Sequence, residues 1–529
     1  MRRRISALVA ASTLVVASSL VAGCAPTGSA MIGGPFAALL ADSTDLGSSR
    51  AGGAQLTVTL PGTARPEALM DWASERDLWV RWATGDQWAV VEGDARNVAE
   101  AFDVPVNDYR SPTGQQFYAS PEQPSLPAGL RGHVTELGRI MSYMPHRTKK
   151  PDILARDVQK GGLTPQGLLD AYNADPLVQE GHTGKGTTIV FFEFDGFDQK
   201  DLDKFADTSG LPRFTPEVVG GVAEKSYGET TMDLQVAHAI APDARLVYVN
   251  ARPTLEGDGG YEKIGQMFTD TDRRYPGAVW SLSIGWACDK FVNAADLAPA
   301  EAALIKAQQN GTTAFDATGD NAGLECKGAD EWSSPPGPDD VGLDALSSMP
   351  TMTAVGATTL STGHRGQWLA EYAWFDAPLS QGTSGGVSNL YARPQWQEHL
   401  PAGRDAGQRR LSPDVSAVGD PFTGVRFIFG QNEYVGAGTS QAAPIWAALA
   451  VLMNQYLEAN GGRRLGNVNP LLYRIAAGSD LPGFRDVGLG GNAVDLAEPG
   501  YDLATGLGSP NTYNLVRNIL ETQRQVAPG

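Results

Sequence analysis

The stretch from Val435 to Ala450 contains a serine whose surroundings suit nucleophilic catalysis. It reads Val-Gly-Ala-Gly-Thr-Ser-Gln-Ala-Ala-Pro-Ile-Trp-Ala-Ala-Leu-Ala, so glycines precede Thr439 and Ser440 and an apolar run follows them. Thr and Ser are favoured at helix starts, and proline is tolerated only in the first turn of a helix, so Pro444 predicts a helix that begins close to Ser440. Its free N–H groups then lie beside that hydroxyl. This is the arrangement of an acyl-transfer nucleophile; the alternative is an ordinary serine N-cap.

A second candidate is an acidic pair on a predicted helix. The segment 228–240 has an apolar stripe with helical spacing, and Glu229 and Asp233 are four residues apart on it. Ionised and exposed, two such carboxylates repel each other by about 0.2–0.5 kcal/mol. A pair that shares a proton instead gives one carboxyl a raised pKa and makes a usable general base; the alternative is a solvated acidic face. His238 lies about 180° around the helix from Glu229, so we predict that the base is not a histidine.

Asp320 is a third candidate, and it follows an apolar segment that is predicted to be a strand. The local sequence from Phe315 is Phe-Asp-Ala-Thr-Gly-Asp-Asn-Ala-Gly, which places glycines on both sides of this carboxylate. Open α/β sheets place their binding sites at the carboxyl ends of strands, so the position suits a functional side chain. Taken alone, a plain Gly-Asp turn is the better interpretation.

The elements that must position these residues are predicted from Leu163 onward. Near-continuous apolar runs alternate there with helical stretches, and the runs cover 187–194, 246–250, 278–284 and 312–317. Runs of this kind are typical of parallel strands covered on both faces. Their alternation with helices predicts a doubly wound parallel α/β sheet, and we assign residues 163–529 to this domain.

A smaller domain is predicted to precede it over residues 54–142. Its strands are expected at 55–60 and 88–92, its helices at 66–75 and 96–102, and a hairpin-like stretch at 109–119. This order predicts a small α+β domain of antiparallel type, and no nucleophile or metal cluster stands out in its sequence. Residues 143–162 are basic, contain proline and lack periodicity, which predicts an exposed linker that proteases can cut. Such a domain joined by such a linker to a hydrolase is the layout of a zymogen.

The amino terminus has the pattern of a targeting sequence. Arginines after Met1 and an Ala/Val/Leu/Ser run that ends at Gly23 predict a signal peptide over 1–23. The run ends Leu-Val-Ala-Gly-Cys, which resembles a bacterial lipobox in which Cys24 is lipidated; a transmembrane anchor is the alternative. Residues 24–53 are predicted to be a flexible tether because they are rich in Gly, Ser and Ala. We expect an exported protein, either held by lipid at the outer face of the cell membrane or extracellular.

The net charge argues against one class of partner, and the cysteine count predicts a disulfide. The 529 residues include 60 acidic and 41 basic side chains, for a formal charge of −19, which argues against nucleic acid as a partner. With Cys24 assigned to lipid, Cys288 and Cys326 remain as an even pair in an oxidising compartment. We therefore expect these two cysteines to be bridged.

Three motifs, considered together, resemble those of one peptidase family. They are Gly228-Glu229-x-x-x-Asp233, Thr318-Gly-Asp320-x-x-Gly323 and Gly438-Thr-Ser440-x-x-x-Pro444. This set resembles the sedolisin family of serine-carboxyl peptidases, and the segments 163–173, 349–356, 384–386 and 413–417 are similar to other landmarks of that family. Residues 55–140 are similar to its activation domain. The resemblance implies a subtilisin-like fold, a pro-domain that inhibits its own peptidase, and a glutamate where subtilisins have histidine.

The resemblance also implies a role for each matching residue. Ser440 would be the nucleophile and Glu229 its general base, and then the acid for the leaving amine. Asp233 would orient Glu229 and share its proton. Asp320 would donate to the oxyanion beside the backbone N–H of Ser440, which requires a protonated carboxyl. The implied activity is that of an acid-acting endopeptidase or tripeptidyl-peptidase that processes itself from a zymogen.

One structural calcium ion near the carboxyl terminus is implied in the same way. Its ligands would be the carboxylates of Asp486 and Asp502 and the backbone carbonyls of Val487, Glu498 and Gly500. Calcium binds six or more hard oxygens, and this set supplies several of them. Glu498 stands where the family has glycine and the intervening loop is shorter than usual, so a glycine-rich surface loop is the alternative.

Other functions remain open on sequence alone. One is a Ser-His-Asp subtilase that uses Asp195 after the first strand of the large domain, and another is an inactive cell-surface binding protein on a peptidase scaffold. The intact catalytic set argues against the binding protein, since an inactive scaffold has no chemical need for it. Two departures from the family, Ala437 and Ile284, leave substrate preference open. We expect a monomer whose partners are peptide or protein substrates and its own pro-domain.

Overall fold

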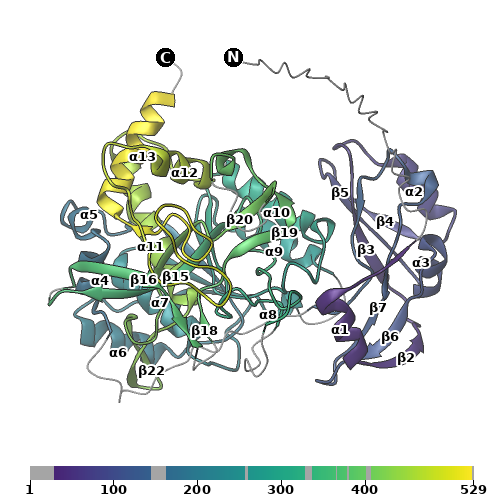
Figure 1. Ribbon diagram of the computed structural model, residues 1–529, viewed down its shortest axis with the longest axis horizontal. Helices are drawn as coiled ribbons and strands as arrows, with labels where there is room; N and C mark the ends of the chain where they lie inside the picture. The colour runs from purple at the N-terminus through teal and green to yellow at the C-terminus, as the bar shows by residue number, and fades with distance from the viewer. Residues whose placement is uncertain are drawn as a thin grey trace, which may run out of the picture.

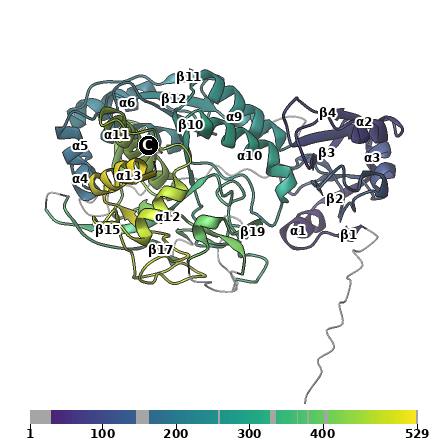
Figure 2. The same ribbon diagram turned by 90° about the horizontal axis from the view of Figure 1, so that it is seen from above.

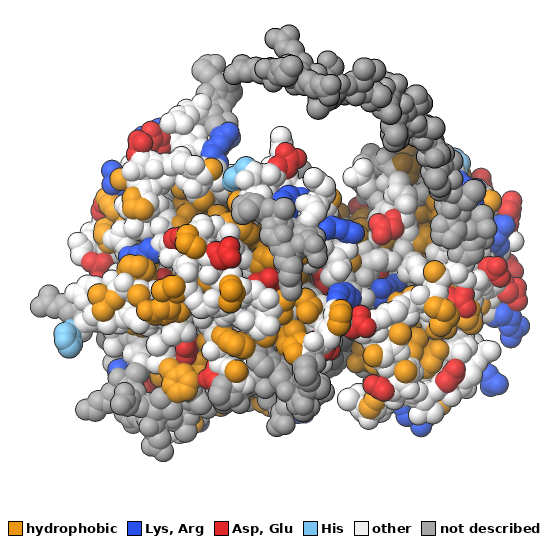
Figure 3. Space-filling view, viewed as in Figure 1, with side chains coloured by type: hydrophobic (Ala, Val, Ile, Leu, Met, Phe, Trp, Pro, Cys, Tyr) orange, Lys and Arg blue, Asp and Glu red, His pale blue; other side chains and the backbone are white. Residues whose placement is uncertain are grey.

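The computed structural model describes residues 29–144, 162–255, 260–327, 336–364, 366–377, 381–400 and 407–526. An N-terminal domain and a larger C-terminal domain lie side by side (Figures 1 and 2). The space-filling view shows them as two lobes with the surface hollowed between them (Figure 3). Within the described ranges, no helix combines the length and hydropathy needed to cross a bilayer. The predicted signal peptide, Cys24 and nearly all of the predicted linker lie outside these residues.

A predominantly parallel sheet organises the larger domain. Its order is β11 (Glu217–Val219), β12 (Arg245–Asn250), β10 (Thr188–Glu193), β13 (Val279–Leu282), β14 (Thr313–Ala317), β15 (Thr353–Thr362) and β16 (Trp368–Ala373), and β21 (Val415–Val418) also pairs with β15. Only β16 pairs antiparallel, and the predicted doubly wound sheet is therefore confirmed. The four apolar runs form β10, β12, β13 and β14, each within one or two residues of the predicted bounds.

Helices cover both faces of this sheet because its strands alternate their side chains between two cores. On β10, Ile189 and Phe191 contact the core that contains α7 (Glu229–Ile240) and α11 (Thr439–Ala459). Val190 and Phe192 face the opposite core, which contains α9 (Glu262–Arg274) and α10 (Ala294–Gln309). The remaining helices of this domain are α4 (Pro165–Ala171), α5 (Asp175–Gln179), α6 (Gln199–Ser209), α8 (Arg252–Leu255), α12 (Asn469–Ala477) and α13 (Thr512–Val526).

The N-terminal domain has the predicted α+β composition. Four strands, β4 (Trp79–Arg81), β5 (Trp88–Gly93), β3 (Ala54–Thr59) and β9 (Glu136–Leu137), form one antiparallel sheet in that order, with α2 (Glu67–Ser74) and α3 (Ala95–Phe102). The hairpin-like stretch forms β6 (Asn107–Arg110) and β7 (Gln116–Ala119), which pair antiparallel. The predicted strands, helices and hairpin are thus confirmed, and β4 and β9 are additional.

The prediction of a flexible tether over 24–53 is wrong for its second half. Residues in this segment form β1 (Ala30–Met31), α1 (Gly34–Asp42) and β2 (Thr44–Ser48), and the two strands pair with β8 (Glu122–Gln123) and β6 of the N-terminal domain. Between them, α1 places the fully buried Phe36 against the larger domain, with 5.4 Å between its ring centroid and that of Phe291. The segment is therefore ordered by pairing with one domain and by aromatic packing on the other.

The two domains also meet along α9 and α10, which lie on the side of the sheet nearest the N-terminal domain (Figure 2). Gln55 Nε2 donates to both carboxylate oxygens of Glu262 at 3.0 Å, and Arg81 donates to the same carboxylate at 3.0 Å. At the other end of the contact, the backbone N–H of Arg139 donates to Asp296 Oδ1 at 2.9 Å. Charged and polar groups from both domains therefore form hydrogen bonds across this interface.

We predict that Phe36→Ala weakens the attachment of the segment 30–48 to the larger domain. Truncating a buried phenylalanine typically costs about 3–5 kcal/mol, because apolar burial is lost and a cavity is left. Urea unfolding of the full chain should show a lower midpoint for this variant. As a control, Phe422→Ala removes a ring that is 46% exposed and should shift the midpoint little. Equal midpoints for the two variants would contradict the packing role of Phe36.

Candidate active site

The structure brings all four predicted catalytic residues to the carboxyl edge of the sheet. Glu229 is the first residue of α7 and Asp233 lies one turn later, while Ser440 is the second residue of α11 and Asp320 follows β14. The two helices pack against each other, which places the carboxyl of Glu229 within interaction distance of Asp233, Ser440 and Asp320. The predicted start of α11 near Ser440 is confirmed.

Glu229 and Asp233 are buried, which excludes the solvated acidic face considered for them. Glu229 is 4% exposed and Asp233 is fully buried. Burial and, next, the charge of Asp233 raise the pKa of Glu229 well above its usual range. Burial also raises the pKa of Asp233 to about 8, although the hydroxyl of Ser283 opposes the shift. The pair therefore loses one of its two protons more readily than both, and in this singly protonated state one carboxyl can accept a proton as a general base.

A further carboxyl group joins this pair, and the sequence analysis did not identify it as part of the site. Glu193, at the end of β10, is fully buried, interacts with Asp233 and accepts a hydrogen bond from Thr230 Oγ1 at 3.2 Å. Burial raises the pKa of Glu193 well above its usual range, with Asp233 as the next cause. A signal was present in the sequence, since Glu193 is a charged residue inside an apolar strand run.

Asp195 has a structural role that leaves a Ser-His-Asp triad without support. Its carboxylate accepts from the backbone N–H groups of Tyr227 at 2.7 Å, Gly228 at 3.2 Å and Thr230 at 3.0 Å, so it caps the start of α7. Among the described residues, no histidine donates a hydrogen bond to this carboxylate. His238 instead stacks on Phe214 and contacts the carbonyl of Pro212 at 2.7 Å.

Asp320 lies at the amino-terminal end of α11, beside the nucleophile candidate. Its Oδ1 accepts from the backbone N–H and from the hydroxyl of Thr439, both at 2.8 Å. Its Oδ2 lies 2.7 Å from the place that a Cβ on Gly438 would take, and Gly438 has a φ of +90°. Any side chain at position 438 would therefore collide with this carboxyl. Oδ1 accepts both of these hydrogen bonds, so a proton on this carboxyl would be carried by Oδ2.

The hydroxyl of Ser440 approaches Glu229 without a well-formed hydrogen bond. The hydroxyl lowers the pKa of Glu229, which places it near that carboxyl. Yet neither Ser440 Oγ nor either carboxylate oxygen of Glu229 has a hydrogen bond of good geometry among the described residues. Catalytic hydrogen bonds are often long in enzymes without a bound substrate and shorten in the reacting complex. The geometry is therefore that of a nucleophile and a base that are close but not yet aligned.

Pro444 does not lie in the first turn of α11, as the sequence analysis required, but in the second. A proline there lacks the N–H that would bind the carbonyl four residues earlier, which is the carbonyl of Ser440. Ser283 compensates, because its hydroxyl contacts that carbonyl at 3.1 Å and Asp233 Oδ2 at 2.5 Å. Ser283 thus links the carboxyl pair on α7 to the backbone of the nucleophile on α11.

The five predicted calcium ligands lie in two neighbouring loops. Asp486 Oδ2 accepts from the N–H of Gly500 at 3.0 Å, and Asp502 Oδ2 accepts from the N–H of Glu498 at 3.3 Å. The carbonyl of Val487 accepts from Thr505 Oγ1 at 3.4 Å, and that hydroxyl also contacts Asp502. Burial raises the pKa of Asp502 to about 6. Two carboxylates and the carbonyl of Val487 thus lie in loops that these hydrogen bonds join, and calcium binds oxygens of these kinds, although no cluster of three or more acidic, His or Cys side chains exists among the described residues.

Cys288 and Cys326 form a disulfide with a Cα–Cα distance of 5.1 Å, which confirms the expected pairing.

Comparisons with known proteins agree with this geometry. No family model matches the chain. The chain is 29% identical to kumamolisin of Bacillus sp. (strain MN-32) over 469 residues, which are 83% of this chain and 80% of that protein. It is 26% identical to sedolisin of Pseudomonas sp. (strain 101), over 79% of this chain and 72% of that protein, and 24% identical to human tripeptidyl-peptidase 1, over 77% and 74%.

A solved structure supports the fold. Pseudomonas sedolisin in complex with pseudo-iodotyrostatin superposes with a TM-score of 0.56 at 23% identity, and the match covers 69% of this chain and 99% of that one. The described architecture is therefore the subtilisin-like α/β fold with a small antiparallel α+β region before it. Over most of its length the chain is a homologue of the kumamolisins and sedolisins, and it is a sedolisin-like serine-carboxyl peptidase.

Proposed function

We propose that this peptidase is an exported, acid-acting endopeptidase or tripeptidyl-peptidase that hydrolyses peptide bonds through an acyl-enzyme on Ser440. The observation that carries the proposal is the buried Glu229–Asp233 pair, with raised pKa values, next to the hydroxyl of Ser440. In this proposal Asp320 donates to the oxyanion, and the substrates are peptides or proteins. No described feature favours the inactive binding protein over the peptidase.

The proposed reaction assigns one proton transfer to each step. Glu229 accepts the proton of Ser440 Oγ as this oxygen attacks the substrate carbonyl carbon. The backbone N–H of Ser440 and the protonated carboxyl of Asp320 donate to the resulting oxyanion. Glu229 then gives its proton to the leaving amine, and water hydrolyses the ester with the same group acting as base. Asp233 holds Glu229 in place, shares its proton, and is itself held by Ser283 and Glu193.

We predict that activity peaks in acid and falls as pH rises. An ionised carboxylate only accepts hydrogen bonds, and an ordinary aspartate ionises near ~3.9, so Asp320 loses its donor as pH rises. Asp320→Asn keeps a neutral donor of similar shape, so it should retain some activity and lose part of the alkaline falloff. Asp320→Ala should fall further, by about 100–1,000-fold in kcat. Rates of hydrolysis of a peptide substrate measured across pH would check this, and a wild-type optimum near pH ~8, far above the aspartate value, would contradict it.

The N-terminal domain is proposed to inhibit the peptidase until the linker 143–162 is cut by the enzyme itself. The contacts of Gln55 and Arg81 with Glu262, and of Arg139 with Asp296, support a domain that stays docked on the precursor. A lipid on Cys24 would hold the precursor at the outer face of the membrane. The mature enzyme is proposed to be monomeric.

We predict that Ser440→Ala accumulates as the full-length precursor when it is refolded in pure form. The substitution removes the proposed nucleophile, so the linker cannot be cut by the same protein. Electrophoresis of the refolded variant against the wild type at acid pH provides the measurement. Normal processing of the pure variant would show that Ser440 is not required for the cut, and restored processing after addition of wild-type enzyme would show that the cut occurs between molecules.

Calcium is proposed to bind at Asp486 and Asp502, with carbonyls of Val487, Glu498 and Gly500, and to hold the two loops together. A ligand that binds only the folded state stabilises it by mass action. Removal of calcium with a chelator should therefore lower Tm, and Asp502→Ala should abolish that response. Asp480→Ala, which removes an exposed carboxylate outside the two loops, should keep it. A wild-type melting curve that does not change in chelator would contradict the site.

A further inference from the structure

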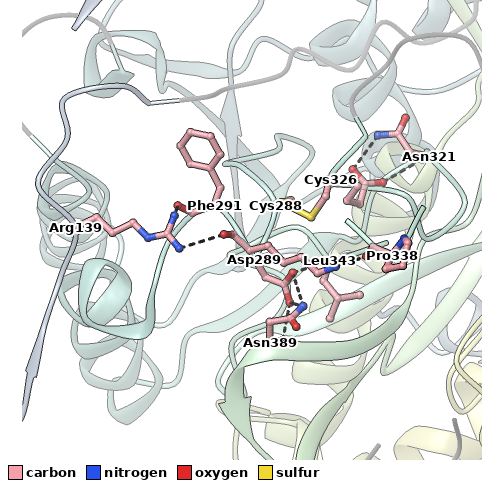
Figure 4. The surroundings of a disulfide bond; sticks show 11 residues. Arg139, Cys288, Asp289, Phe291, Asn321, Cys326, Pro338, Leu343 and Asn389 are labelled. Carbon is pink, nitrogen blue, oxygen red and sulfur yellow. Dashed lines mark hydrogen bonds between the residues drawn. A yellow bond between two sulfur atoms is a disulfide. The ribbon is translucent and has the colours of Figure 1, made fainter. Parts of the chain in front are cut away.

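We propose that the Cys288–Cys326 disulfide is a positioning element for Asp320, and that it fixes the oxyanion side of the active site relative to the Ser283 side. The inference rests on the proposed function of Asp320. The bond, shown with its surroundings in Figure 4, lies outside the catalytic set, but each of its cysteines follows closely in the sequence after a residue of the site. Cys288 comes five residues after Ser283, and Cys326 comes six residues after Asp320.

The first end of the disulfide is tied to the carboxyl pair through a short, held segment. Ser283, directly after β13, donates to Asp233 Oδ2 at 2.5 Å. Three residues later the backbone N–H of Trp286 donates to Asp344 Oδ2 at 2.8 Å, and Cys288 itself pairs with Asp344. The chain between Ser283 and Cys288 is thus anchored at both ends.

The second end belongs to the loop that carries Asp320. Glu325, directly before Cys326, closes this loop: its Oε1 accepts from the N–H of Asn321 at 3.0 Å, and its Oε2 accepts from Asn321 Nδ2 at 3.1 Å. Ser384 donates to the same Oε1 at 2.6 Å. The position of Cys326 is therefore transmitted to Asn321, and so to Asp320, through one buried carboxylate.

A third segment lies under the bond and contacts both of its ends. The N–H of Asp289 donates to the carbonyl of Leu343 at 2.8 Å, and the N–H of Cys326 donates to the carbonyl of Asp340 at 3.1 Å. A Cβ on Gly342 would lie 2.3 Å from Cys326 Sγ, so the sulfur packs directly on that glycine. The disulfide adds a covalent restraint to backbone hydrogen bonds that already join the two loops.

In the precursor, the N-terminal domain contacts the segment that follows Cys288. Arg139 donates to the carbonyl of Lys290 at 3.2 Å and to the carbonyl of Phe291, just beyond Cys288 (Figure 4). These contacts are lost when the N-terminal domain leaves. The disulfide then provides more of the restraint on the segment around Cys288. Its effect on catalysis should therefore be measured on processed enzyme.

An oxyanion donor acts only within about 2.7–3.1 Å of the oxygen it stabilises. Misplacement of a catalytic group by about 1 Å can cost about 100-fold in rate. Opening the disulfide should therefore lower kcat by about 10–100-fold, while KM changes by less than about 2-fold because the substrate-binding surface is not removed.

The test is a double-mutant cycle on processed enzyme at acid pH. Cys288→Ser with Cys326→Ser should lower kcat in the wild-type background and should have no further effect in the Asp320→Ala background. The reason is that the position of the loop no longer matters once its donor is gone. An equal loss in both backgrounds would overturn the proposal, because a bond that serves only overall folding affects both alike.

A second measurement applies if the double variant does not fold. Folded wild type and folded Asp320→Ala are treated with tris(2-carboxyethyl)phosphine, which breaks the S–S bond, leaves a thiol on each cysteine and becomes the phosphine oxide with oxygen from water. Both thiols are then blocked with iodoacetamide, and circular dichroism confirms the retained fold. Loss of kcat in the wild type alone supports the proposal, and an unchanged wild-type kcat overturns it.

The oxyanion role of Asp320 and the positioning role of the disulfide can be tested separately. If Asp320→Ala keeps wild-type activity at acid pH, the proposed oxyanion role of Asp320 is wrong. If Asp320→Ala loses activity but opening the disulfide does not, only the positioning role of the disulfide is wrong.

Discussion

Burial of carboxyl groups that form no ion pair with a cation among the described residues is the constraint on which the proposed active site depends. Glu193, Glu229 and Asp233 lie together at the carboxyl edge of the sheet, and no lysine or arginine is among the main causes that shift their pKa values. Ionised carboxylates are very costly to bury, so such groups keep their protons instead. The raised pKa values follow from this, and Glu229 can act as a base only in the state in which the pair has lost one of its protons.

The same constraint links stability to pH. A carboxyl whose pKa is raised in the folded state stabilises the fold below its ordinary pKa, and that contribution is lost as pH rises through the raised value. For Asp233 this window runs from about 3.9 to about 8. Hydrogen bonds limit the shift, and Ser283 and Glu193 both lower the pKa of Asp233 in this way. Because Ser283 also contacts the carbonyl that Pro444 leaves without a helical partner, one hydroxyl serves both helices of the site.

Much of the fold could be predicted because parallel strands buried on both faces appear in the sequence as near-continuous apolar runs. The edge strands β11 and β16 could not, since β11 has no buried side chain, β16 alternates exposed with less exposed side chains, and neither forms a long apolar run. The proposed catalytic residues were predicted from motifs, whereas Glu193 belongs to no motif and is marked only by its place in an apolar strand run. The order of the segment 30–48 depends on contact between Phe36 and Phe291, which lie far apart in the chain. The proposed carbonyl ligands at Val487 and Gly500 would leave no side-chain signal, because a backbone carbonyl is present at every residue.

The strap formed by β1, α1 and β2 has a consequence for what a cut in the linker does. The strap holds the N-terminal domain to the larger one without any covalent bond, through Phe36 and its aromatic neighbours. Before the cut, a detached domain rebinds at the high effective concentration that a connecting chain imposes. After the cut, the same contacts become an encounter between two separate molecules. Dilution alone then shifts the binding equilibrium toward the free peptidase. Release therefore depends on the concentration of the cleaved N-terminal domain.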